Sequence, residues 1–189
     1  MIRRICIFCG SRFGNKPDYK EAAEALGELL AKENIGVVYG GASVGLMGTV
    51  ADACLANGGE VIGVIPQKLA DRELAHTGLT EQYFVSTMHE RKGKMADMSD
   101  GFISLPGGSG TMDELFETWT WEQLGFHQKP CGILNIAGYY DPLVEMVDHM
   151  VKEGFLQEKY QDTLLVESNP GRLLEKFRQY EPPTAKWHD

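Results

Sequence analysis

Short apolar segments alternate along this chain with longer segments in which apolar residues recur every three or four positions. The apolar segments, which predict buried strands, are residues 4–9, 36–39, 60–65, 102–105, 132–136 and 164–167. The periodic segments, which predict helices, are residues 19–33, 46–56, 88–98, 111–124, 142–153 and 171–180. Nearly all-apolar strands separated by helices are typical of a parallel sheet covered on both faces. The pattern therefore predicts an α/β fold with a single doubly wound parallel sheet.

Two segments stand apart from this alternation. No linker or repeat divides residues 1–180, so we expect one domain there, followed by a frayed tail at residues 181–189, which contains Pro182 and Pro183. Residues 67–87 form a polar excursion after the third strand, long enough for a loop or lid over a site.

Composition narrows the possible partners and the compartment. A net charge of −9 offers no basic footprint on the scale that nucleic acids require, so we expect no nucleic-acid partner. No run of about 18 apolar residues exists, so we expect no membrane span and no membrane partner. The basic amino-terminal residues are followed too early by Gly10 and Arg12 for a signal peptide, which favours a cytoplasmic protein.

The cysteines and histidines give no indication of a metal. Each of the four cysteines has apolar neighbours, so we expect buried, reduced core residues, in agreement with a reducing compartment. Cys6 and Cys9 have the spacing of a metal-binding pair, but residues three apart in a strand point to opposite faces. The histidines show no ligand spacing, and the sequence therefore supports no metal site.

The glycine-rich run from Pro106 to Glu114 carries the strongest chemical signal. It joins an apolar strand to a helix with one apolar face, so that backbone N–H groups and the positive helix end point at one spot, which suits a phosphate. Glu114 follows about one helical turn, roughly 5 Å, beyond that spot. The run therefore predicts a site that holds a 5′-phosphate and acts on the sugar. Alternatively, the glycines relieve crowding and Glu114, opposite the apolar face, is a solvated charge.

Two more glycine turns follow predicted strands. One contains Gly10 and Ser11, and the other contains Gly40 and Gly41. In a doubly wound sheet these turns share the edge where ligands bind, which predicts a nucleotide crevice. The first turn lacks the spacing Gly-x-Gly-x-x-Gly, and the second strand ends in Tyr39 rather than in an acidic residue, so a dinucleotide-binding site is disfavoured.

Charged residues occur on the methionine-rich face of the helix predicted at residues 88–98. Arg91 and Lys92 fall on this face, where a charge is costly unless it is paired or faces a ligand. Either both side chains extend past the methionines to solvent, or the donor fork of Arg91 binds a ligand. Glu73, in the polar excursion, either covers the ligand or is a solvated charge.

Two of these motifs together resemble the paired signature of the Lonely Guy family. They are Met88-His-Glu-Arg-Lys92-x-x-Met95 and Pro106-Gly-Gly-x-Gly-Thr-x-x-Glu114, and the similarity extends over nearly the whole chain. The resemblance implies a Rossmann-like fold, a homodimer with sites near the subunit interface, and hydrolysis of an N⁶-substituted adenosine 5′-monophosphate to the free base and ribose 5-phosphate. Some relatives carry a lysine decarboxylase label, but nothing in this chain identifies a pyridoxal-phosphate lysine, and we expect no cofactor.

The resemblance also implies roles for individual residues. Arg91 and Glu114 match the catalytic pair. The other expected contacts to substrate, from the motif positions and the glycine turns, are Gly10, Ser11, Gly40, Gly41, Glu73, Lys92, Gly107, Gly108, Ser109, Gly110, Thr111 and Thr120. The chain departs from the family at Arg12, where the first turn often has a second serine, and at Asp113, where many relatives have glutamate.

Two alternatives remain open at this level. One is a nucleosidase for plain AMP or other nucleotides in salvage, and the other is a non-catalytic carrier of a nucleotide or of molybdenum cofactor. The Arg91/Glu114 pair favours an enzyme, because a carrier does not need a carboxylate beside the sugar. Residues that discriminate between substrates are expected in the excursion at residues 67–87 and in a partner subunit.

Overall fold

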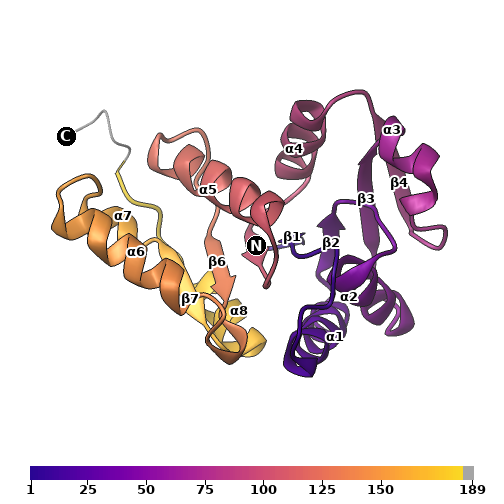
Figure 1. Ribbon diagram of the computed structural model, residues 1–189, viewed down its shortest axis with the longest axis horizontal. Helices are drawn as coiled ribbons and strands as arrows, with labels where there is room; N and C mark the ends of the chain where they lie inside the picture. The colour runs from indigo at the N-terminus through magenta and orange to yellow at the C-terminus, as the bar shows by residue number, and fades with distance from the viewer. Residues whose placement is uncertain (185–189) are drawn as a thin grey trace.

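The computed structural model describes residues 1–184, apart from the side chain of Glu73. Seven parallel strands form one sheet in the order β4-β3-β2-β1-β5-β6-β7 (Figure 1). The strands are β1 (Arg4–Phe8), β2 (Gly36–Tyr39), β3 (Val61–Pro66), β4 (Glu81–Val85), β5 (Phe102–Ser104), β6 (Cys131–Leu134) and β7 (Leu164–Glu167). The chain moves outward from β1 to β4 and then returns to place β5 on the other side of β1. The strand order therefore reverses between β1 and β5, where such sheets bind ligands.

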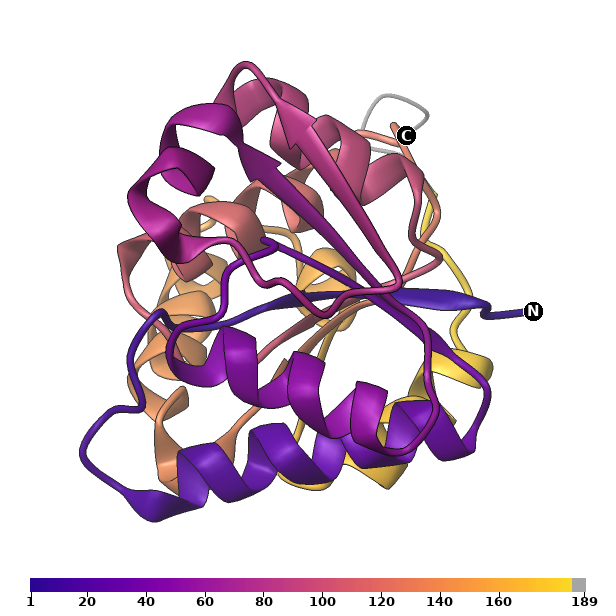
Figure 2. The ribbon, with the colours of Figure 1, turned by 90° about the vertical axis from the view of Figure 1, so that its right-hand side faces the viewer.

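Helices cover both faces of the sheet (Figure 2). The helical elements are α1 (Pro17–Lys32), α2 (Gly45–Ala56), α3 (Gln67–Leu69), the π-helical turn η1 (Ala70–Leu74), α4 (Met88–Asp97), α5 (Ser109–Gln123), the 3₁₀ turn η2 (Ile136–Gly138), α6 (Asp141–Lys152), α7 (Glu158–Gln161) and α8 (Pro170–Arg178). Helices α1, α2 and α8 contribute to one core, and α4, α5 and α6 contribute to the other. This arrangement confirms the doubly wound fold, and each end of the twelve predicted elements lies within two residues of its predicted position.

Strand β1 shows how the sequence builds the two cores. Ile5 and Ile7 belong to the core beneath α1 and α2, whereas Cys6 and Phe8 belong to the core beneath α4 and α5. Successive side chains of a strand point to opposite faces, so a strand in the middle of a covered sheet must be apolar throughout. The four cysteines are free and buried, as the sequence predicted.

The prediction of a loop at residues 67–87 was wrong, whereas the place of this segment over the site stays a prediction. The segment forms α3, η1 and then β4, which pairs with β3 at the edge of the sheet. An edge strand pairs on one side only, and β4 carries the exposed Glu81 and Phe84, so the continuous apolar run that marks the inner strands is missing. The residues before β4 lie against the second glycine turn, because Ser43 N donates to Leu74 O at 2.9 Å and His76 N donates to Gly41 O at 2.9 Å.

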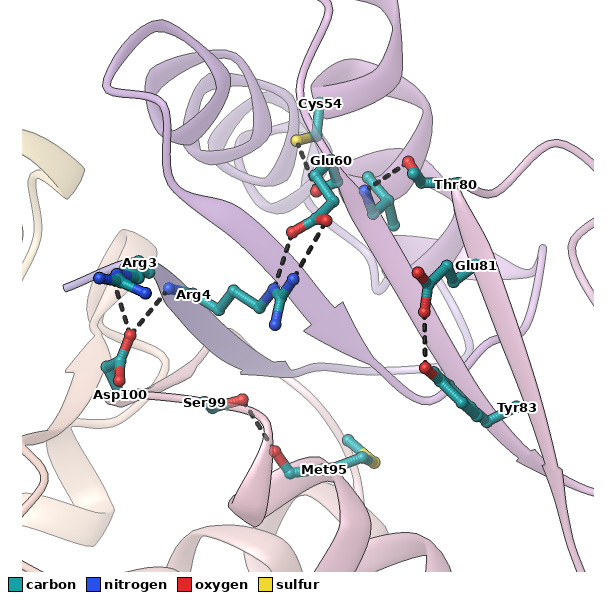
Figure 3. Close-up of polar contacts among 11 residues, drawn as sticks. Arg3, Arg4, Cys54, Glu60, Thr80, Glu81, Tyr83, Met95, Ser99 and Asp100 are labelled. Carbon is teal, nitrogen blue, oxygen red and sulfur yellow. Dashed lines mark hydrogen bonds and ion pairs between the residues drawn. The ribbon is translucent and has the colours of Figure 1, made fainter.

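The start of the inner strands is fixed by polar contacts at the amino edge of the sheet (Figure 3). Arg4 of β1 donates from Nε to Glu60 Oε2 at 2.7 Å and from Nη2 to Glu60 Oε1 at 3.2 Å. Asp100, which precedes β5, accepts from the backbone N–H groups of Arg3 and Arg4 at 2.7 and 3.1 Å. These contacts link β1, β3 and β5 at the edge opposite the glycine turns.

The last described residues pack on the helical layer that carries α5. Tyr180 donates its hydroxyl to the buried Glu122 of α5 at 2.6 Å, and Tyr160 donates to Thr184 O at 3.4 Å. Residues 185–189 of the tail predicted to fray lie outside the described residues. Within residues 1–184, no helix has the length and apolar character needed to cross a membrane.

Candidate active site

The three glycine turns interlock at the carboxyl edge of the sheet. Gly10 N donates to Pro106 O at 3.0 Å, and Leu46 N donates to Gly10 O at 3.1 Å. A Cβ added to Gly10 would lie 3.2 Å from Gly107 Cα, and one added to Gly45, which has a φ of +56°, would overlap the backbone of Ser11. Some of the glycines therefore serve close packing between the turns, which is the structural alternative that the sequence left open.

A pocket of about 330 Å³ opens between the first turn and the turn before α5. Gly10, Ser11, Gly107 and Gly108 line it, so four of the expected substrate-binding residues share this pocket. Three aromatic side chains, Phe13, Tyr19 and Tyr139, also line it. Sequence reasoning assigned these rings no role in the site. The available signal was the segment Gly138-Tyr139-Tyr140-Asp141, which lies within the similarity to the family. In the structure Tyr139 donates its hydroxyl to Gly107 O.

The first turn of α5 presents free backbone donors beside this pocket. Gly108 is the N-cap residue and has extended backbone geometry, with no side chain capping the helix. Apart from neighbours along the chain, no atom of the described residues lies within 4 Å of a Cβ added to Gly108 or Gly110, so glycine at these positions leaves open space rather than relieving a contact. Ser109 is exposed, whereas Thr111 is buried beneath Gly107. The unpaired N–H groups of the first turn and the positive helix end make this a suitable anion site.

Arg91 is held inside the protein rather than reaching the surface. It is 9% exposed, and its Nε donates to Val64 O of β3 at 3.1 Å. Gly40 makes room for the guanidinium, because a Cβ at that position would overlap Nη2 of Arg91. The alternative in which Arg91 extends past the methionines to solvent is therefore wrong. The expected residues Gly40 and Arg91 are in contact.

Glu114 faces Arg91 from α5. The Glu114 side chain is 12% exposed, and Arg91 Nη1 lies 3.9 Å from Glu114 Oε1, too far for a direct hydrogen bond. Burial raises the pKa of Glu114 above its usual range, although Arg91 opposes this shift. The interpretation of Glu114 as a solvated charge is therefore wrong. Arg91 of the neighbouring helix α4 lies beside Glu114, a relation between two helices that the pattern of a single helix does not reveal.

The remaining expected contacts are divided between other places. Lys92 is paired with Asp113 at 2.8 Å and with Glu117 at 3.1 Å. Thr120 is exposed on the outer side of α5, in a hollow that Arg91 and Glu114 do not line. Glu73 lies in η1, whose neighbouring Leu74 contacts the second glycine turn, but the Glu73 side chain lies outside the described part.

Within the described residues, no group of three or more histidine, cysteine, aspartate or glutamate side chains is arranged to hold a metal. The chemistry available at this edge therefore comes from a buried carboxyl, a buried guanidinium and the backbone donors of α5. Such a set can bind an anion and stabilise positive charge a short distance away.

Solved structures with the same fold include a molybdenum cofactor binding protein from Rippkaea orientalis and a molybdenum cofactor carrier protein from Chlamydomonas reinhardtii. The first has a TM-score of 0.72 and 21% sequence identity, covering 95% of this chain and 97% of that chain. The second has a TM-score of 0.72 and 16% identity, covering 95% of this chain and 98% of that chain. At these identities the likeness shows the fold alone.

Sequence comparison gives a closer likeness. A cytokinin riboside 5′-monophosphate phosphoribohydrolase of Arabidopsis thaliana is 47% identical over 181 residues, covering 96% of this chain and 85% of the relative. A probable enzyme of the same name from Oryza sativa subsp. japonica is 48% identical over 185 residues, covering 98% of this chain and 76% of the relative. The model of a family described as possible lysine decarboxylase matches residues 47–177. The chain therefore belongs to the family of the Lonely Guy cytokinin riboside 5′-monophosphate phosphoribohydrolases.

Proposed function

We propose that the protein hydrolyses the N-glycosidic bond of N⁶-substituted adenosine 5′-monophosphates and releases the free base and ribose 5-phosphate. The observation that carries this proposal is the buried pair of Arg91 and Glu114, 3.9 Å apart, in which Glu114 belongs to the helix whose first turn offers open backbone donors. Family membership supports it, because relatives that are 47% and 48% identical are named for this activity.

In the proposed complex the 5′-phosphate binds at the first turn of α5. The backbone of Gly107 to Thr111 donates to its oxygens, and Gly10 and Ser11 close the site from the first turn. This contact provides position rather than chemistry, since it holds the anomeric carbon at a defined distance from the phosphate. It also explains why we expect the protein to hydrolyse nucleoside 5′-monophosphates and not the unphosphorylated nucleosides.

Cleavage of the bond between C1′ and the base leaves positive charge on the ribose, as in other glycoside hydrolyses. Ionised Glu114 stabilises that charge and accepts a proton from the water that attacks C1′. The base departs with the bonding electron pair and takes up a proton from solvent, and Glu114 returns to solvent the proton that it accepted from the attacking water. Arg91 keeps the substrate in register and stabilises negative charge on the leaving base. The separation of Arg91 from Glu114 supports these roles, because neither group is consumed by a hydrogen bond to the other.

Product analysis by chromatography tests the proposal. Purified protein is incubated separately with N⁶-isopentenyl-AMP, AMP and the matching unphosphorylated nucleosides. We expect free base and ribose 5-phosphate from the monophosphates alone, with the ratio between the two substrates separating cytokinin activation from nucleotide salvage. No release from any substrate at micromolar enzyme would contradict the proposal and favour a carrier.

The assembly and location of the protein are part of the same proposal. We expect a homodimer with the site near the subunit interface, since Met88, Phe126 and Met146 expose large apolar side chains on the helical layer that contains Arg91 and Glu114. In such a dimer Thr120 contacts substrate bound by the partner subunit, and Glu73 covers the base. Light scattering during size-exclusion chromatography tests the dimer. We also expect a cytoplasmic protein with no nucleic-acid or membrane partner, and the net charge of −9 supports the expected absence of a nucleic-acid partner.

A further inference from the structure

Two adjacent tyrosines hold the turn that carries the proposed phosphate site. The buried Tyr140 donates its hydroxyl to Leu105 O at 2.7 Å. The more exposed Tyr139 donates its hydroxyl to Gly107 O. The carbonyl between these two, that of Pro106, accepts from the backbone N–H at the start of the first glycine turn at 3.0 Å. Three consecutive carbonyl groups of the turn are therefore each held by a donor from another segment of the chain.

The held carbonyls fix the direction of the N–H groups that follow them. A peptide group is planar and trans, so its N–H and its C=O point in opposite directions. The carbonyl of Pro106 shares a peptide group with the N–H of Gly107, and the carbonyl of Gly107 shares one with the N–H of Gly108. Among the described residues, neither of these N–H groups donates to another protein atom. Each is open to a ligand and points away from the contact that holds its carbonyl.

The two N–H groups depend on contacts of different kinds. That of Gly107 is oriented by a backbone hydrogen bond to the first glycine turn, whereas that of Gly108 is oriented by the side chain of Tyr139. Little else restrains Gly108, because a Cβ added there would meet no atom of the described residues within 4 Å apart from its chain neighbours. A peptide group between two glycines has access to more than one orientation. The hydroxyl of Tyr139 selects one of them.

Tyr139 is itself held in place before any ligand binds. Its ring meets that of Tyr19 of α1 edge-on, with the centroids 5.8 Å apart, and that of Tyr140 edge-on at 5.0 Å. The chain reaches it through two residues with left-handed backbone, Ala137 at a φ of +51° and Gly138 at a φ of +72°. A ring packed on two sides loses little freedom when a ligand binds, so its hydroxyl is already in position.

We propose that Tyr139 is a positioning residue for the phosphate: its hydroxyl holds the peptide group between Gly107 and Gly108 in the orientation in which the Gly108 N–H donates to the 5′-phosphate. The consequence for turnover rests on the proposed function. The effect on binding of a sugar phosphate does not require that any bond is hydrolysed.

The ring and the hydroxyl of Tyr139 can be tested separately. The ring lines the pocket and packs on Tyr19, and both contacts survive in Tyr139→Phe. The same variant removes the donor to Gly107 O. A change of affinity in Tyr139→Phe therefore reports on the hydroxyl and not on the shape of the pocket.

The first test measures binding and kinetics of the wild type and Tyr139→Phe. We expect the affinity for ribose 5-phosphate, measured by calorimetry, to fall about fivefold, the effect of one lost hydrogen bond. We expect KM for N⁶-isopentenyl-AMP to rise by a similar factor, with a smaller change in kcat, because the remaining donors of the turn still hold the phosphate. Binding of free adenine, which has no phosphate, should not change.

The matched control removes a tyrosine hydroxyl from the edge strand β4. Tyr83 donates to Glu81 Oε2 at 2.6 Å, and we expect Tyr83→Phe to bind ribose 5-phosphate as the wild type does. Equal affinity of the wild type and Tyr139→Phe for ribose 5-phosphate would overturn the proposal. An equal loss of affinity for ribose 5-phosphate and for adenine would also overturn it, because that pattern indicates a general disturbance of the pocket.

A second measurement separates this proposal from the proposed function. Ribose 5-phosphate is titrated into the ¹⁵N-labelled wild type and Tyr139→Phe, and the amide signal of Gly108 is followed by NMR. We expect a downfield shift of this amide proton in the wild type and a smaller shift at saturation in Tyr139→Phe. That result supports the proposal even if no nucleotide is hydrolysed, in which case only the proposed function fails. A Gly108 amide that does not respond to bound ribose 5-phosphate, or that responds equally in both proteins, overturns the role of Tyr139.

Discussion

The two edges of the sheet carry the same kind of charge pair in different states. At the amino edge, Arg4 and Glu60 form two hydrogen bonds, their side chains are 38% and 39% exposed, and the hydrogen bond from Arg4 lowers the pKa of Glu60 (Figure 3). At the carboxyl edge, Arg91 and Glu114 are about one-tenth exposed and 3.9 Å apart, and burial raises the pKa of Glu114.

The difference shows that residue types alone do not decide the role of a pair. The Arg4–Glu60 pair is closed by two direct hydrogen bonds and serves to join β1 to β3. The Arg91–Glu114 pair is removed from water without closing on itself, so both groups keep capacity for a ligand. The edge with the open pair is also the edge where parallel sheets of this order bind ligands.

The largest expected effect comes from removing the charge of Glu114. We expect Glu114→Gln to lower kcat at least about 100-fold, the range for a lost acid–base group, while binding of ribose 5-phosphate measured by calorimetry survives. The corresponding change at the other edge, Glu60→Gln, is the control and should leave kcat unaltered. Near-normal turnover of Glu114→Gln would remove this residue from the mechanism.

A smaller loss is expected when Arg91 is displaced without being changed. In Gly40→Ala the added Cβ overlaps Nη2 of Arg91, so the guanidinium must move, and we expect kcat to fall roughly tenfold or more because an ångström-scale misplacement is costly. The control is Gly93→Ala in α4, where an added Cβ meets nothing within 4 Å. That variant should be fully active and about 0.5–1 kcal/mol more stable in urea unfolding. Equal activity of both variants would contradict the assigned place of Arg91.

The two glutamates should also affect stability in opposite directions. The folded-state pKa of Glu114 is raised, so its contribution to stability is present at low pH and is lost as the pH rises through that pKa. We therefore expect Glu114→Gln to raise the melting temperature near neutral pH, with the gain disappearing on acidification. A loss of melting temperature at neutral pH would show that the Glu114 carboxylate stabilises the fold.

The smallest effect is expected at Glu60. Its folded-state pKa is lowered, so its contribution is present above the unfolded-state pKa and is lost as the pH falls through the folded-state pKa. Because both partners are more than one-third exposed, we expect Glu60→Gln to cost only about 0.5 kcal/mol at neutral pH and nothing in strong acid. Chemical denaturation at several pH values measures this, and a cost that grows on acidification would contradict it.

The fold was readable from the sequence because the inner strands are apolar throughout and each helix has one apolar face. Strand β4 was missed, since an edge strand needs apolar side chains on only part of its surface. In the site, the glycine turns could also be predicted, because each follows an apolar strand directly in the sequence. The environments of Arg91 and Glu114 could not, because they depend on the Val64 carbonyl, 27 residues before Arg91, and on an ion pair between side chains of two different helices.

The bond between Tyr180 and Glu122 has a consequence for limited proteolysis. Glu122 lies in the last turn of α5, the helix whose first turn is the proposed phosphate site, and it accepts the Tyr180 hydroxyl at 2.6 Å. A protease that removed the chain from Tyr180 onward would leave all seven strands intact but deprive a buried carboxyl of its shortest hydrogen bond. Carboxyl-terminal trimming would therefore destabilise the helix that carries Glu114. Cleavage at the amino terminus, before Arg4, would leave this hydrogen bond in place.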